Sequence, residues 1–142
     1  MKIVFKISPQ PKSRLTQRDQ WKERPAVSRY FAFRDHVKYL VRMKGLQGIP
    51  GAIECITFFV AMPQSWSIKK QAEMNGKPHQ QVPDLDNYLK GFLDALCIED
   101  KHIHYIGNLQ KVWAEAGSIE MTLPENCEQM PEQIGTDVYK YL

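Results

Sequence analysis

The chain has 142 residues, of which 43% are hydrophobic and 11% aromatic. This is enough for the core of one domain and too apolar for a disordered chain. Its longest apolar stretch, residues 55–62, is far shorter than the ~18 residues of a membrane-spanning helix. Three cysteines without a CxxC spacing indicate neither a disulfide framework nor a zinc ribbon, and no secretion signal stands near the start, so we expect a cytoplasmic domain.

The net charge of +3 is unevenly distributed along the chain. Residues 1–45 carry 12 Lys and Arg against 3 Asp and Glu, whereas residues 46–124 carry 6 against 9. A basic first third joined to an acidic middle suits a polyanionic partner held near carboxylates. A solvated basic face explains the same distribution equally well.

The first half of the chain shows strand and helix patterns separated by a long loop. Residues 1–7 alternate apolar and polar side chains, which predicts a half-buried strand. Two prolines and a polar run predict a loop over residues 8–25. Apolar spacing predicts a helix over residues 28–44 with Ser28 as its N-cap. Residues 52–62 are rich in β-branched and aromatic side chains, which predicts a central strand.

The second half predicts two more helices and two strands. Residues 63–74 contain a helix start with Ser65 as a possible cap, and residues 85–96 form the best-patterned amphipathic helix. Residues 103–115 and 118–123 are expected to form a β-hairpin through the short turn between them.

This order of elements predicts one α+β domain over residues 1–124, with a small mixed β-sheet flanked by helices. Residues 125–142 are polar and acidic and are expected to form a loosely held tail.

Carboxylates gather around the best-patterned helix. Asp84 and Asp86 stand at the entry to the helix, where both side chains can converge, and Asp100 follows soon after its end. Three carboxylates together repel one another unless a divalent cation lies between them, and oxygen ligands suit Mg²⁺ or Mn²⁺. A simpler reading is that acidic residues are favourable at any helix start. Lys90, one turn after Asp86 and one before Asp94, can form surface ion pairs or hold a phosphate.

A second metal site is conceivable just beyond this helix. Asp100, His102 and His104 share a face if their segment is extended, and such a set could bind zinc for a hydrolytic reaction. A surface strand in which histidines alternate with Ile103 accounts for the same pattern.

Several segments stand in the order of a known family's signature. They are residues 9–14, residues 62–70, residues 83–87, Lys90, residues 93–96, Glu99 with Asp100, and Lys111 with Trp113. This set, which spans roughly residues 1–124, resembles the RusA-type Holliday-junction resolvases, or crossover junction endodeoxyribonucleases. These are small homodimeric nucleases of bacteria and their phages or prophages.

The resemblance implies that Asp84, Asp86 and Asp100 ligate a catalytic Mg²⁺ or Mn²⁺ ion and that Lys90 is the essential active-site lysine. It also implies paired, symmetric cleavage of four-way DNA junctions by a homodimer in recombination and repair. The family's usual Asp-Asp pair is Glu99-Asp100 here, so whether Glu99 joins the metal site is left open.

Junction DNA is recognised mainly by shape and backbone, so a basic surface is expected to contact it. The candidate contacts are Lys12, Arg14, Lys69, Lys70 and Lys111. No nucleotide-binding motif is present and no membrane partner is expected. The alternative function is a branched-DNA binding protein that does not cleave.

Overall fold

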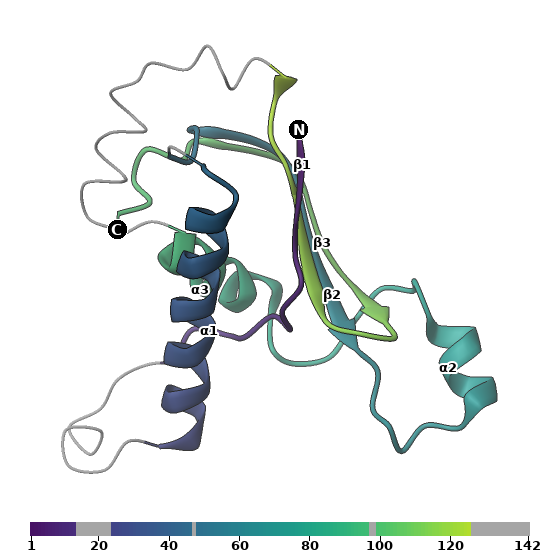
Figure 1. The fold of residues 1–142 in the computed structure, drawn as a ribbon. Coiled ribbons are helices and arrows are strands. Elements are labelled where there is room, and N and C mark those ends of the chain that lie inside the picture. Colours follow the sequence, from purple (N-terminus) through teal and green to yellow (C-terminus); the bar gives the residue numbers. More distant parts are fainter. Residues whose placement is uncertain (14–23, 47, 97–98, 126–142) are drawn as a thin grey trace. The chain divides into compact units, whose positions relative to one another are not determined.

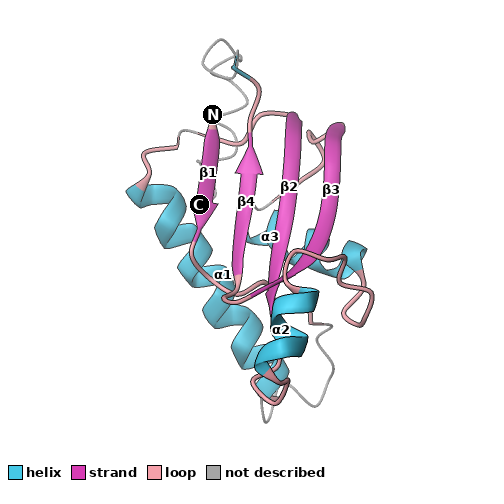
Figure 2. Ribbon diagram, turned by 90° about the vertical axis from the view of Figure 1, so that its right-hand side faces the viewer, coloured by secondary structure: helices cyan, strands magenta, loops and turns pink. Residues whose placement is uncertain are grey.

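The apolar run in the middle of the chain forms the central strand of a four-stranded sheet (Figures 1 and 2). Here β2 (Ala52–Ala61) pairs with β3 (Tyr105–Ala114) on one side and with β4 (Ser118–Thr122) on the other, and β1 (Lys2–Phe5) lies beyond β4. The β2–β3 pair is parallel and the other two pairs are antiparallel, which confirms the predicted mixed sheet. The computed structural model describes residues 1–13, 24–46, 48–96 and 99–125.

The described chain divides into two compact units. A sheet unit contains the four strands and α2 (Ile68–Met74), and a helical unit contains α1 (Pro25–Met43), α3 (Leu85–Leu96) and the segments next to them. The domain boundary predicted at residue 124 stays a prediction, and the tail beyond residue 125 lies outside the described residues. Within the described ranges, none of the helices combines the length and apolarity needed to cross a membrane.

The core of the sheet unit lies along β2 and β4. Ile56 stands opposite Met121 and Phe58 stands opposite Ile119, and all four side chains are fully buried. Such directly opposed apolar pairs stabilise an antiparallel ladder. β2 is therefore held from both sides, as expected for the most apolar strand of the chain.

The predicted hairpin between β3 and β4 is wrong, because β2 lies between these two strands. The connection over residues 115–117 crosses the end of β2, where the Met62 amide donates to the Ala114 carbonyl at 2.9 Å. Gly117 makes this tight crossing possible, since a Cβ there would lie 2.7 Å from the Cα of Ser8. A short connection favours neighbouring strands. Here β2 instead pairs along both of its edges, with β3 on one side and β4 on the other.

The residues between α2 and α3 cover the outer edge of β3 near its end. Gly76 donates to the Trp113 carbonyl, Trp113 donates back to Lys77, and His79 donates to Lys111, at 2.8, 2.9 and 3.0 Å. The cap of α2 is Ser67, whose hydroxyl accepts from the Lys70 amide at 3.1 Å, and not Ser65 as predicted.

The helical unit is built on two amphipathic helices. α1 begins at Pro25, so the prediction of Ser28 as its cap is wrong; Arg24 precedes the helix and its side chain makes no capping bond. Proline is favourable in a first turn because its φ is already helical and its missing N–H would have no partner there. α3 spans residues 85–96 as predicted, because its apolar stripe is continuous. The stripe of α1 buries Val27, Tyr30, Phe33, Val37 and Val41.

One titratable side chain in the sheet unit is buried without a partner for one of its nitrogens. His79 is 4% exposed, and the centroid of its ring lies 4.3 Å from that of Trp113. Its Nδ1 makes no hydrogen bond within the described residues. Burial first, and then the positive charge of Lys111, lower the pKa of His79 below its ordinary value. The folded state therefore favours the neutral ring.

We predict that His79 makes the protein less stable in acid. Because the pKa of His79 is lower in the folded state, the stability that depends on its neutral ring is fully present above the unfolded pKa of about 6.5. That stability is lost as pH falls through the folded pKa. Thermal unfolding at neutral pH and at about pH 5 measures this loss. The loss should be smaller in His79→Phe and unchanged in His104→Gln, whose imidazole is exposed; equal losses in both variants would contradict the prediction.

Candidate active site

Two of the predicted metal ligands stand at the start of α3. The Asp84 carbonyl accepts from the amides of Asn87 and Tyr88 at 3.1 and 3.2 Å, so Asp84 is the residue from which the helix begins. Asp86 lies in the first turn, where its carboxylate accepts from the Asn87 amide at 3.0 Å. Negative charge is favourable at this end of a helix. Both residues are exposed to solvent.

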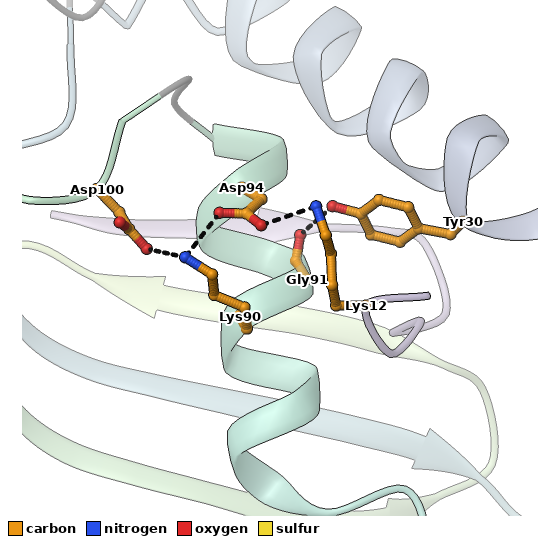
Figure 3. Close-up of polar contacts among 6 residues, drawn as sticks. All are labelled: Lys12, Tyr30, Lys90, Gly91, Asp94 and Asp100. Atoms are coloured by element: carbon orange, nitrogen blue, oxygen red, sulfur yellow. Dashed lines mark hydrogen bonds and ion pairs between the residues drawn. The ribbon is translucent and has the colours of Figure 1, made fainter. Parts of the chain in front are cut away.

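One turn after Asp86, Lys90 is held between two carboxylates (Figure 3). Its Nζ lies 3.0 Å from Oδ2 of Asp100 and 3.2 Å from Oδ1 of Asp94. These hydrogen bonds, the one to Asp100 first, raise the pKa of Lys90, so the ammonium is protonated at neutral pH. The Lys90 side chain remains 54% exposed, and an ammonium placed in this way can reach a ligand from solvent.

A second ammonium joins this group from the N-terminal segment. Nζ of Lys12 lies 2.9 Å from Oδ2 of Asp94 and 5.1 Å from the centre of the Tyr30 ring. Lysine and carboxylate side chains therefore alternate along one row, which Figure 3 shows across the face of α3. We call Lys12, Asp94, Lys90 and Asp100 the charge row.

The segment that carries Lys12 lies directly against α3. The Lys12 amide donates to the Asn87 carbonyl at 3.3 Å, and a Cβ on Gly91 would lie 2.7 Å from the Gln10 carbonyl oxygen. The hydroxyl of buried Tyr30 donates to the Gly91 carbonyl at 3.1 Å. Burial first, and then the charge of Asp94, raise the pKa of Tyr30 to about 12, so this hydroxyl keeps its proton.

The predicted site residues are thus only partly brought together. Lys90 contacts Asp100 and also Asp94. Within the described residues it forms no ion pair with Asp86. Asp86 bonds the amide next to it, a local partner that competes with Lys90. Across the described ranges, no three or more His, Cys, Asp or Glu side chains form a group able to hold a metal ion. The metal assignments to Asp84, Asp86 and Asp100 therefore stay predictions.

The histidines beyond α3 have different surroundings. Nε2 of His102 lies 2.8 Å from the Ile49 carbonyl oxygen, so one ring nitrogen already has a partner. His104 is exposed. Among the described residues, neither histidine belongs to a group of three or more potential metal ligands.

The remaining candidate DNA contacts belong to the sheet unit or lie outside the described residues. Lys69 and Lys70 are exposed on α2, and Nζ of Lys70 lies 4.3 Å above the Trp66 ring. Nζ of Lys111 donates to the Gln81 carbonyl at 2.6 Å. Arg14 lies outside the described residues.

Asp94 is a residue that the sequence interpretation named only as an ion-pair partner of Lys90 and did not assign to the site. Its spacing from Lys90 predicts the i,i+4 ion pair that the structure contains. Nothing in that spacing indicates Lys12, which is 82 positions earlier in the chain. Gly91 is the available signal, because a glycine inside a well-patterned helix indicates that another segment packs closely against it.

We predict that Gly91→Ala detaches residues 10–12 from α3. Alanine in a helix is ordinarily about 0.5–1 kcal/mol more favourable than glycine. Here its Cβ would meet backbone atoms of Gln10 and Lys12 at 2.7 and 3.1 Å, so the segment must move. Hydrogen exchange at the Lys12 amide should become faster in the variant. An unchanged exchange rate together with a higher melting temperature would contradict the prediction.

Comparisons with known proteins connect this geometry with a family. The family model described as Endodeoxyribonuclease RusA matches residues 5–123. A search of curated protein sequences found no match. The matched range covers most of the chain and includes every member of the charge row together with Asp84 and Asp86. On this evidence the chain belongs to the RusA family of endodeoxyribonucleases.

Proposed function

We propose that the protein is a metal-dependent, structure-selective endodeoxyribonuclease that resolves Holliday junctions by paired, symmetric cleavage of the DNA. The observation that carries this proposal is the exposed Lys90 ammonium, which Asp94 and Asp100 hold on the helix that begins at Asp84 and Asp86. Membership of an endodeoxyribonuclease family supports hydrolysis of a DNA phosphodiester as the reaction.

The donor chemistry of the site fits Mg²⁺ or Mn²⁺. Asp84 and Asp86 offer exposed carboxylates. Asp100 is half-buried, and its partner Lys90 is exposed. Carboxylate oxygens with partial hydration are the ligands that these ions prefer. When bound, such an ion supplies an activated water and stabilises charge on the phosphate. Asp100 would then share its oxygens between the ion and Lys90, which retains Asp94 as a second partner.

Lys90 is suited to bind the scissile phosphate. Its ammonium stays protonated at neutral pH, because both neighbouring carboxylates raise its pKa. A fixed positive charge next to the reacting phosphate stabilises the negative charge that develops in the transition state. The two carboxylates restrict the lysine side chain to one region, so little rearrangement is needed when DNA binds.

Binding of the junction is assigned to basic side chains on both units. We propose that Lys12, Arg14, Lys69, Lys70 and Lys111 contact the sugar-phosphate backbone. Affinity that depends on phosphate contacts falls steeply with salt concentration. The contact between Lys70 and the Trp66 ring supports this role, because it keeps the ammonium extended over an aromatic surface that a nucleotide can also approach.

Paired cleavage requires two active sites on opposite strands. We propose a homodimer with two-fold symmetry that matches the symmetry of a four-way junction. In this proposal the enzyme acts in the cytoplasm, in recombination and repair of chromosomal or prophage DNA, without a nucleotide cofactor.

One observation favours a second candidate, a branched-DNA binding protein without cleavage activity. Asp100 is neutralised by Lys90, and no group of three potential metal ligands occurs in the described ranges. A protein of this kind would use the charge row only to hold DNA. The two candidates differ in their response to divalent metal.

Cleavage of a labelled mobile four-way junction in Mg²⁺ or Mn²⁺ distinguishes the candidates. We predict symmetric paired nicks with the wild-type protein and loss of cleavage, with binding retained, in Asp86→Asn. Asp35→Asn is the matched control, because Asp35 is an exposed carboxylate on α1 paired with neighbouring Arg34. Tight binding without cleavage by the wild type in either metal would reject the nuclease proposal and favour the second candidate.

A further inference from the structure

Asp94 uses both of its carboxylate oxygens to hold ammonium groups. Oδ1 binds Lys90 at 3.2 Å and Oδ2 binds Lys12 at 2.9 Å. Its side chain is 19% exposed, compared with 54% for Lys90 and 41% for Lys12. The carboxylate is therefore the inner member of the group, and the two lysines are the members that solvent and ligands can reach.

The contacts of residues 10–12 follow one face of α3. Asn87, Gly91 and Asp94 are spaced by four and three residues, so they lie in a row along the helix. Asn87 accepts the Lys12 amide, Gly91 leaves room for the backbone, and Asp94 binds the Lys12 ammonium. The position of the Lys12 side chain is thus determined at both ends, by a backbone bond and by an ion pair.

Tyr30 supports the same arrangement from α1. Its hydroxyl donates to the Gly91 carbonyl, and its ring lies 5.1 Å from Nζ of Lys12. A lysine over an aromatic ring is attracted by the negative face of that ring. An isolated surface ion pair would contribute little order, but here a backbone bond, a ring and a carboxylate all restrict one lysine.

We propose that Asp94 is a positioning residue of the nuclease site, which holds the ammonium groups of Lys90 and Lys12 side by side as a paired cation for one phosphodiester. This inference rests on the proposed function. Without Asp94, Lys90 retains only Asp100 as its carboxylate partner, and Lys12 loses its contact with α3 beyond the backbone bond. Asp94 acts through the two lysines and does not itself touch the DNA.

The first test is Asp94→Asn, which keeps the size of the side chain and removes its charge. We expect the single-turnover rate constant for junction cleavage to fall by up to about 100-fold, as for other small displacements of catalytic groups. The dissociation constant of the junction should change little, and Asp35→Asn should cleave like the wild type. Unchanged cleavage in a folded Asp94→Asn protein would overturn the proposal.

A double-mutant cycle separates positioning from a general loss of stability. Lys12→Gln alone should slow cleavage, while Lys44→Gln, an exposed lysine after α1, should not. If Asp94 couples the two lysines, Lys12→Gln should add no further loss in the Asp94→Asn background. If the rate loss of the double variant equals the product of the two single losses, the coupling is contradicted. If Asp94→Asn does not fold, the comparison of Lys12→Gln with Lys44→Gln still tests whether Lys12 takes part in cleavage.

A third measurement tests the proposal without DNA or metal. An ammonium bound to a carboxylate is shielded from amine-acetylating reagents, so Lys12 and Lys90 should react more slowly than Lys44 in the wild type. Mass spectrometry should show both becoming faster in Asp94→Asn, with Lys44 unchanged. Equal rates at all three lysines in the wild type would overturn the positioning role. If the wild type fails to cleave junctions while this protection is found, the proposed function fails and the positioning geometry stands.

Discussion

The sharing of the Asp94 carboxylate between two lysines is the interaction on which the arrangement of the candidate site depends. It connects an N-terminal segment to α3, and through Lys90 it connects the helix to Asp100 beyond its end. The charge row contains two cations and two anions, so its partly buried members carry no uncompensated charge. Removing any one member leaves the other three with a net charge, so the members of the row are electrostatically linked.

Local patterns in the sequence predict the elements of the fold well and their connections less well. The stripe of α3 determines both of its ends, and the composition of β2 identifies it as the central strand. The predicted cap of α1 was wrong because a serine pattern does not reveal that Pro25, three residues before Ser28, can start the helix. The predicted cap of α2 was wrong because Ser65 and Ser67 both precede the helix, and the sequence does not rank one above the other. The hairpin was wrong because strand order depends on pairing energies along the whole of β2, which a three-residue connection does not reveal.

Local sequence patterns likewise predict some contacts of the candidate site and miss others. Lys90 and Asp94 lie one helical turn apart, so periodicity predicts their contact. The expected partner Asp86 instead bonds the adjacent amide, since a short side chain in a first turn finds backbone donors close by. Lys12 contacts Asp94 and Asp100 contacts Lys90 because of the tertiary fold. Tertiary contacts of this kind leave no periodic pattern in the sequence. The position of Asp100 just past the helix makes it a candidate, and the resemblance to a family gives it its expected role.

The pairing of β1 with β4 has a consequence for the protein during its synthesis. Lys2 faces Thr122 across this pair, so β1, which leaves the ribosome before the other strands of this sheet, pairs with β4, the last of them. β2 also lacks its antiparallel neighbour until β4 has emerged. Pairing between such distant segments is slow, because loop closure precedes any gain from contacts. A nascent chain therefore carries unpaired strand edges until β4 has emerged, and the four-stranded sheet forms only then.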